Sequence, residues 1–260
     1  MKQIKQALRK TWIYPVKKFL DNYNPTNLYR YRKAIKFYSQ FLQPGDLCFD
    51  VGANIGNRTD IFLDIGAKVA CIEPQDICLN ILKRKFSNNQ NVILIDKAVG
   101  DYEGYADLSI CEDASTISTL SEKWIQESRF SNEFQWTRKQ SVEITKLDTL
   151  INLYGLPKFC KIDVEGFELS VIKGLNQPIP YISFEFSREV LEDTKKCINH
   201  LQEIGKVELN FSIGESMELF LSQWVTPNKL YEEFNKLSDK LLWGDVYAKF
   251  TKSKSDFISN

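Results

Sequence analysis

The sequence predicts an α/β fold built on a mostly parallel sheet with helices on both of its faces. From residue 47 onward, short apolar runs alternate with stretches of helical periodicity, as in strand–helix–strand units. The first of these runs leads directly into a glycine-containing turn, and such turns bind ligands in open parallel sheets. The 260 residues are 43% hydrophobic and include 17 Phe, 11 Tyr and 5 Trp, so the chain can bury a full core.

The expected elements follow from these patterns in chain order. The apolar runs predict strands at Leu47–Val51, Lys68–Ile72, Val92–Ile95, Lys158–Ile162 and Tyr181–Phe186. Helices are expected at Asn57–Ile65, Asp76–Phe86, Leu147–Leu153, Glu168–Gly174 and Arg188–Ile204. The last third is strand-like at Lys206–Ile213, Met217–Trp224 and Gly244–Phe250, with a helix over Asn228–Leu242. This change of pattern predicts an antiparallel addition at one edge of the sheet.

The charge pattern divides the chain. Residues 1–36 carry ten basic residues and one acid, a net charge of +9, so the remainder carries −9 in a chain that is neutral overall. We expect residues 1–44 to form a basic helical extension that packs on the domain or on a second subunit. Peripheral contact with an anionic membrane or a protein through residues 1–20 is the alternative, since Ile4, Leu8, Trp12, Val16 and Phe19 share one helical face.

The remaining divisions follow from composition. Residues 45–250 are expected to form the main domain, in which 101–146 are a substrate-facing insert. Residues 251–260 read as a flexible tail. The oligomeric state is not readable from the sequence.

Several function classes are disfavoured at once. The balanced charge makes nucleic acid an unlikely partner for the surface as a whole, and no apolar run approaches the ~18–20 residues of a membrane span. Six cysteines without a Cys-x-x-Cys pair predict reduced core thiols in a soluble, cytoplasmic protein. The single histidine, His200, lies far from every motif, which argues against the usual zinc sites and Ser-His-Asp triads.

The first motif follows the first expected strand and reads Asp50-Val51-Gly52-Ala53-Asn54-Ile55-Gly56. Gly52 permits a tight turn against a ligand, Asn54 tolerates a left-handed conformation, and Gly56 lets the next helix pack closely. The turn lacks the G-x-G-x-x-G pattern of dinucleotide sites. It is therefore a poor match to an NAD-dependent oxidoreductase.

Two acids end consecutive strands. Asp50 would repel a pyrophosphate but suits a ligand with a positive end, and Glu73 lies where a carboxylate can accept hydrogen bonds from ribose hydroxyls. Together they favour S-adenosylmethionine, whose ammonium and sulfonium groups are cationic. Asp96 and Lys97 end the third strand, at the position where an adenine base would lie. They can equally be ordinary loop residues.

These motifs occur together in a recognisable order. With Glu73-Pro74, Ala98-Val99-Gly100-Asp101 and Lys161-Ile162-Asp163-Val164-Glu165-Gly166-Phe167-Glu168, the sequence resembles the FkbM family of S-adenosylmethionine-dependent methyltransferases over roughly residues 45–186. The resemblance implies a Rossmann-like class I methyltransferase fold of seven strands, the last antiparallel. It also implies O-methylation of a hydroxyl on a sugar, glycan or small natural product.

The resemblance also assigns the residues of a cofactor site. Those it implies for S-adenosylmethionine are Asp50, Gly52, Ala53, Asn54, Gly56, Glu73, Pro74, Asp96, Lys97 and Ala98. The Ser-rich stretch around Ser118 and Thr119 resembles a family segment near the active site, and with Glu168 these are the candidate substrate-binding residues. Acids in a first helical turn also suit the helix dipole, so Glu168 has a structural alternative.

The chemistry is expected at the end of the Lys158–Ile162 strand. A hydroxyl acceptor must lose its proton, and without a suitably placed histidine a carboxylate is the expected base. The candidates are Asp163 first, Glu165 second and Glu185 in reserve. The same three acids would also suit Mg²⁺, but the sequence does not favour a metal over acid–base work, so no metal site is predicted.

Two alternatives to a small-molecule or carbohydrate methyltransferase stay open at this point. The +9 segment is compatible with an RNA methyltransferase. A non-catalytic cofactor-binding scaffold, recruited through its basic N-terminal helix, belongs to a different class.

Overall fold

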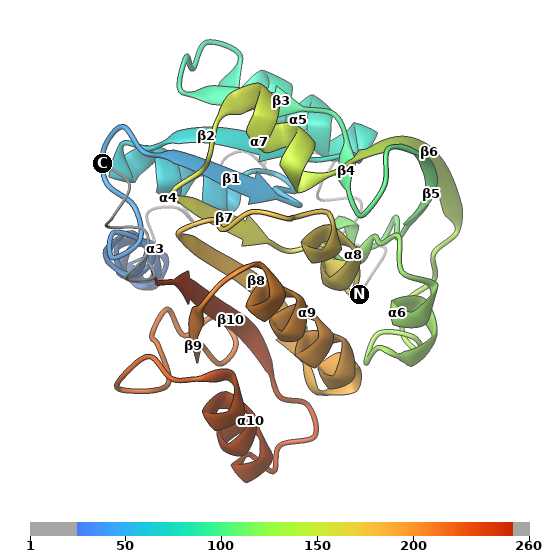
Figure 1. Ribbon diagram of the computed structural model, residues 1–260. Coiled ribbons are helices and arrows are strands. Elements are labelled where there is room, and N and C mark those ends of the chain that lie inside the picture. The colour runs from blue at the N-terminus through green and yellow to red at the C-terminus, as the bar shows by residue number, and fades with distance from the viewer. Residues whose placement is uncertain (1–24, 252–260) are drawn as a thin grey trace.

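The computed structural model describes residues 25–251 and contains a seven-stranded sheet with helices on both faces (Figure 1). The strand order is β3-β2-β1-β7-β8-β10-β9. The bounds are β1 Leu47–Val51, β2 Lys68–Ile72, β3 Val92–Ile95, β7 Phe159–Ile162, β8 Tyr181–Ser187, β9 Val207–Phe211 and β10 Trp243–Phe250. Neighbours pair in parallel except at β10, which is antiparallel to both β8 and β9. The predicted α/β class, with an antiparallel addition at one edge, is confirmed.

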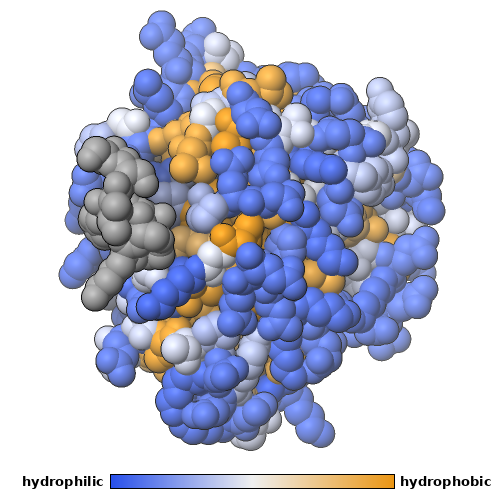
Figure 2. All heavy atoms as spheres, in the orientation of Figure 1, coloured by the Kyte–Doolittle hydropathy of each residue, from blue (hydrophilic) through white to orange (hydrophobic). Residues whose placement is uncertain are grey.

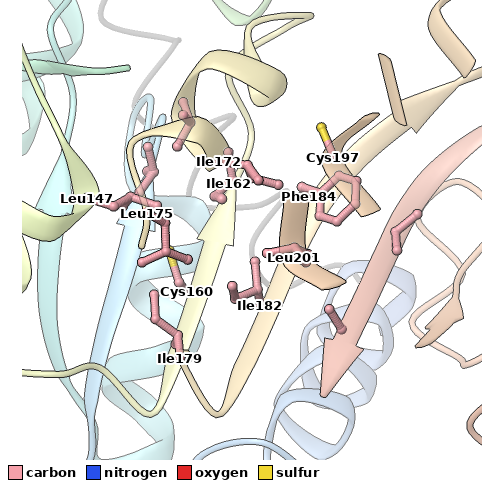
Figure 3. Packing of buried hydrophobic residues seen from close by; sticks show 14 of the residues in the cluster. Leu147, Cys160, Ile162, Ile172, Leu175, Ile179, Ile182, Phe184, Cys197 and Leu201 are labelled. Atoms are coloured by element: carbon pink, nitrogen blue, oxygen red, sulfur yellow. The ribbon is translucent and has the colours of Figure 1, made fainter. Parts of the chain in front are cut away.

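Helices cover the sheet in two layers because each strand sends alternate side chains to opposite faces. One layer holds α3 Pro25–Tyr38, α4 Asn57–Ile65 and α5 Asp76–Phe86, and the other holds α7 Leu147–Tyr154, α8 Glu168–Lys173 and α9 Leu191–Ile204. In β1, for example, Cys48 packs with the first layer, whereas Phe49 and Val51 pack with the second. Figure 3 shows the second core, where side chains of α7, α8 and α9 meet β7 and β8.

A second, three-stranded sheet extends from the carboxyl end of β3. It contains β4 Ala98–Val99, β5 Gly104–Ile110 and β6 Arg138–Thr145 in the order β4-β6-β5. The 3-10 helix η1 Ser115–Ile117 and helix α6 Glu122–Glu127 lie in the connection between β5 and β6. Two strands of this sheet, β5 and β6, lie in the insert expected at 101–146, whereas β4 precedes it.

Two expected elements differ from the structure. Met217–Trp224 is not a strand, because the Asn210 side chain bonds to the backbone of Leu221 and leaves only an isolated bridge between Leu209 and Val225. Helix α10 spans Pro227–Lys236 and ends earlier than predicted. The guanidinium of Arg188 donates to the carbonyl groups of Phe234 and Leu237 and thereby satisfies groups at that helix end.

The start of the described chain packs on the domain. Ala34, Phe37 and Tyr38 of α3 and the following Phe41 and Leu42 are buried against the face that carries α4. The predictions for the amphipathic residues 4–19 and for the tail from residue 252 onward lie outside the described residues. They stay predictions.

All six cysteines are buried and unpaired in the structure, as expected for core thiols, and the compartment stays a prediction. Within residues 25–251, no helix combines the length and the apolar character that a bilayer span requires. The face in Figure 2 is mostly hydrophilic and carries its apolar residues in several separate areas.

Candidate active site

The register of the central strands brings three motifs to one edge of the sheet. Val51 of β1 pairs with Ile72 of β2 and with Ile162 of β7, so the chain leaves all three strands at the same level. Gly52, Glu73 and Asp163 each follow directly. Carboxyl ends of parallel strands form the ligand-binding edge in such sheets.

The turn after β1 lies directly against the segment after β7. Gly52 has φ 79°, and a Cβ atom built on it would stand 1.9 Å from the carbonyl oxygen of Asp163. Its amide and that of Ala53 donate to the carbonyl oxygen of Ile72 at 3.0 and 3.1 Å. Asn54 also has a positive φ of 51°, as its residue type allowed us to expect. Only glycine fits at position 52.

Glu73 is buried and is held by the backbone of both neighbouring loops. Its Oε2 accepts from the amide of Asn54 and its Oε1 from the amide of Gln75, each at 2.8 Å. Burial raises the pKa of Glu73 to about 7, although both hydrogen bonds oppose the rise. Each oxygen keeps a lone pair for a further donor, so the side chain can accept from ribose hydroxyls.

These loops surround a cavity of about 450 Å³, within the size range of small-molecule sites. The predicted site residues that line it are Gly52, Asn54, Glu73, Pro74, Lys97, Ala98, Ser118, Thr119, Asp163, Glu165 and Glu185. Cofactor and acceptor candidates therefore share one cavity.

Other predicted residues do not reach the cavity wall: Asp50, Ala53, Gly56, Asp96 and Glu168. Asp50 is buried behind the turn, where its Oδ2 accepts from the Thr59 hydroxyl at 2.6 Å, and burial raises its pKa. A Cβ on Gly56 would meet Leu82 and Phe86 at 2.8 Å, so this glycine serves helix packing. Asp96 is exposed.

Glu168 supports the neighbouring loop instead of contacting the cavity. Its Oε1 accepts from the amides of Val164 and Gly166 at 3.1 and 3.3 Å. Burial raises the pKa of Glu168 to about 7. This carboxylate shapes the segment that presents Glu165, whose φ is 54°. Its predicted role in substrate binding is therefore corrected to a structural one.

Three carboxyl groups meet at the cavity floor. Asp163, Glu165 and Glu185 each have an oxygen within 4.8 Å of those of the other two, so the set has the spacing to hold a metal ion. Burial, followed by the charge of Asp163, raises the pKa of Glu165 well above its ordinary value. Burial and then the charge of Glu165 do the same for Glu185. At this spacing the charge of one carboxylate disfavours ionisation of its neighbours.

The insert contributes cavity residues that the sequence patterns did not single out. Trp124, Arg129 and Phe130 line the cavity beside Ser118 and Thr119. Arg129 forms a bidentate ion pair with Glu189 at 2.8 and 2.9 Å, and Lys123 pairs with Asp193 at 2.6 Å. These bonds fasten the insert to the 3-10 helix Arg188–Val190 and to the first turn of α9. The sequence offers no signal for this long-range pairing beyond the polar, aromatic character of the segment.

The fold and the cavity define a class of protein. The sheet order with its antiparallel β10, the glycine turn after β1 and the carboxylate after β2 are those of a class I S-adenosylmethionine-dependent methyltransferase. The residues present fit this methyl donor, because the Gly52 turn and Glu73 line one cavity and Glu73 offers carboxylate oxygens to a ribose.

The family follows from the sequence. The model of the methyltransferase FkbM domain matches residues 50–208, more than half of the chain. The protein belongs to the FkbM methyltransferase family, which confirms the predicted resemblance. None of the curated proteins matches the chain in sequence.

Several solved structures are similar to this chain at low sequence identity. Precorrin-6y C5,15-methyltransferase from Geobacter metallireducens is 10% identical with a TM-score of 0.45, over 84% of this chain and 87% of that one. SMU.1697c from Streptococcus mutans, in complex with SAH, is 12% identical with a TM-score of 0.42, over 88% and 98%. An S-adenosylmethionine-dependent O-methyltransferase from Thermotoga maritima is 10% identical with a TM-score of 0.39, over 85% and 66%. The family assignment does not rest on these likenesses.

Proposed function

We propose that the protein transfers the methyl group of S-adenosylmethionine to a hydroxyl oxygen of a sugar, a glycan or a small natural product. The observation that supports this proposal is the placement of Asp163, Glu165 and Glu185 in the same cavity as the Gly52 turn and Glu73. A hydroxyl acceptor needs a base, and carboxylates are the groups available there. The single histidine is on α9, where its Nε2 lies 2.8 Å from the carbonyl oxygen of Leu175.

Asp163 is the proposed base. Its side chain is 39% exposed and lines the cavity. The acceptor oxygen attacks the methyl carbon, the carbon–sulfur bond breaks with its electron pair on sulfur, and the acceptor proton passes to the Asp163 carboxylate. The protein otherwise aligns the two reactants and keeps water out, which the aromatic side chains of the insert favour.

A metal-free reaction is part of the proposal. The Lys161 ammonium lies 3.1 Å from Asp163 Oδ2 and supplies a positive charge beside the proposed base without a metal ion. We therefore expect methyl transfer to persist in excess chelator. Loss of activity in EDTA with recovery on addition of Mg²⁺ would instead identify the three carboxylates as a metal site.

The test begins with binding and ends with transfer. Calorimetry with S-adenosylhomocysteine should show binding, and labelled S-adenosylmethionine should methylate at least one member of a library of sugars and hydroxylated metabolites. Asp163→Asn should keep the affinity for S-adenosylhomocysteine within about threefold and reduce the transfer rate by about 10²–10⁴. Asp113→Asn, at an exposed acid of the insert, is the matched control. Full activity of the Asp163 variant would refute the assignment of the base.

The acceptor and the compartment stay predictions. Contact of residues 1–20 with a membrane or a protein also stays a proposal, since that segment lies outside the described residues.

A further inference from the structure

A buried lysine connects the cavity with the interior of the sheet. Lys161 is on β7 and only 1% exposed. Its Nζ lies 3.1 Å from Oδ2 of Asp163 and 3.0 Å from Oδ1 of Asp245, which is on β10. The other oxygen of Asp245 lies 3.4 Å from the hydroxyl of Tyr247. The ammonium is thus held between one carboxylate in the core and one that faces the cavity.

Neutralising the charge of Lys161 requires only one of its two carboxylate contacts. An ammonium in a sheet interior costs several kcal/mol unless an anion and hydrogen bonds compensate it. Asp245, which is 9% exposed, supplies such an anion from the neighbouring part of the sheet. The second contact, to Asp163, joins Lys161 to a carboxylate that has access to solvent. It therefore calls for an explanation beyond neutralisation of a buried charge.

The conformation of Asp163 depends on this contact. Its backbone is fixed, because its amide donates to the carbonyl oxygen of Val51 at 2.9 Å and its own carbonyl oxygen lies against Gly52. The side chain has no comparable support, since within residues 25–251 Lys161 is the donor that bonds to its carboxylate. The nearest other groups, Glu165 and Glu185, are acids that would repel it or share a proton with it.

We propose that Lys161 is a positioning residue for methyl transfer, which holds the Asp163 carboxylate turned toward the cavity. The proposal rests on the proposed function, in which Asp163 takes the acceptor proton. Lys161 lies behind Asp163 and acts through it. In this division of roles Asp163 accepts the acceptor proton, whereas Glu165 and Glu185 are further carboxyl groups that line the same cavity.

The charge environment includes groups from every element packed around the pair. These groups are Asp50 on β1, Arg58 on α4, Tyr38 on α3, Glu185 on β8, Asp245 and Tyr247 on β10, Glu165 in the loop after β7, and Glu168 at the start of α8. Arg58 is paired with Glu215. Lys161 is therefore the cation that directly contacts the acidic cluster.

The test removes the buried cation and its core anion together. Lys161→Met alone would leave Asp245 unpaired in the core and destabilise the fold, so Lys161→Met/Asp245→Asn is the informative variant. Lys158→Met, at the exposed lysine just before the same strand, is the matched control. Circular dichroism and calorimetry with S-adenosylhomocysteine should show that the double variant folds and binds within about threefold of the original protein.

Two measurements then distinguish a positioning role of Lys161 from a purely structural one. With the acceptor found in the library, kcat/KM of the double variant should fall at least tenfold, and the acid limb of its pH profile should move up by about one unit or more, because loss of a contacting cation favours the protonated carboxyl. The Lys158 variant should change neither. Unchanged activity and profile in the double variant would show that Lys161 serves only as a counter-ion for Asp245.

The second readout does not depend on turnover. Carbon-13 spectra of labelled aspartates, with Asp163→Asn for assignment, should show a shifted resonance of the Asp163 carboxyl in the double variant and an unshifted one in the Lys158 variant, because the ammonium that contacts this carboxyl is gone. An unmoved resonance in the double variant would overturn the proposal. If the original protein methylates nothing in the library, the proposed function fails, whereas these spectra still decide whether Lys161 contacts and orients Asp163.

Discussion

At the residue scale, Glu73 combines two properties that usually exclude each other. The carboxyl is 2% exposed, yet both of its oxygens accept backbone hydrogen bonds that favour the ionised form. Burial outweighs those bonds and sets its pKa near neutrality, at about 7. Small changes of pH should therefore change the charge that a ribose meets at this position.

This property makes cofactor binding depend on pH. The ionised carboxylate accepts hydrogen bonds from hydroxyls, so affinity for S-adenosylhomocysteine should be greatest above pH 7 and fall by about tenfold per unit below it. Glu73→Gln should lower the affinity at pH 8 by about 10- to 100-fold and abolish the pH dependence. Calorimetry between pH 6 and pH 8 measures both effects. Asp107→Asn, at an exposed strand position, is the control, and an unchanged affinity of the Glu73 variant would refute the ribose assignment.

The sequence predicted the types of residue at the site better than their individual roles. Strand ends and glycine turns are local features, so the sequence alone was enough to place Gly52, Glu73 and Asp163 at one edge of the sheet. Whether a side chain points toward a cavity depends on neighbours distant in sequence. Thr59 turns Asp50 inward and the amides after β7 engage Glu168, and no local pattern indicates either contact.

At the scale of elements, the loops after β1 and β7 act as a unit. The amide of Asp163 bonds to Val51, and the Gly52 turn lies against the carbonyl oxygen of Asp163. The insert adds a third side, since the Thr119 hydroxyl donates to the carbonyl oxygen of Glu165 at 2.7 Å. A change in any one of these loops therefore alters the others.

Two glycines with similar φ angles allow the effect of backbone strain to be measured separately from the effect of a steric clash. Gly52 has φ 79° and Gly45 has φ 90°, but a Cβ on Gly45 would meet nothing within 4 Å. Gly52→Ala should reduce affinity for S-adenosylhomocysteine at least about tenfold, because the Asp163 carbonyl must move. Gly45→Ala should cost about 1–2 kcal/mol of folding stability and leave that affinity unchanged. Calorimetry and urea denaturation measure the two effects, and equal affinity losses would contradict this account.

Elements with a strong periodic pattern were predicted closely, whereas those that depend on tertiary contacts were not. The bounds of β1, β2, β3, α4 and α5 agree with the patterns in the sequence. The short β4 has too few residues to show a period, and the predicted strand at 217–224 gives way to hydrogen bonds made by Asn210. Apolar content alone could not distinguish these cases.

At the scale of the whole molecule, the acids of the site oppose folding at neutral pH. The pKa values of Asp50, Glu73, Glu165, Glu168 and Glu185 are all raised by burial. The unfolded chain releases these protons at lower pH than the folded one, so the folded state binds more protons in between. The acids whose pKa is lowered, such as Glu189 and Asp193, stabilise the fold above their ordinary pKa and lose this contribution only as pH falls below it, so they do not alter the dependence near neutrality.

The free energy of unfolding should therefore fall as pH rises from 5.5 to 7.5. Glu73 or Glu168 alone, each with a pKa of about 7, contributes roughly 2 kcal/mol to this fall. Urea denaturation at the two pH values measures it. Glu168→Gln should flatten the dependence and Glu112→Gln, at an exposed acid of the insert, should not. A protein that is more stable at pH 7.5 would contradict the protonation assigned to the cavity.

The contact between Gly52 and the Asp163 carbonyl has a consequence for how such an enzyme can diversify. The turn at the methyl-donor site is in direct contact with the backbone of the proposed base, so neither side of the cavity can be changed without affecting the other. New acceptor preferences are expected to arise in the segment from Ser115 to Phe130, which borders the same space from a separate small sheet. Attempts to redirect the enzyme should begin there and leave both strand-end turns untouched.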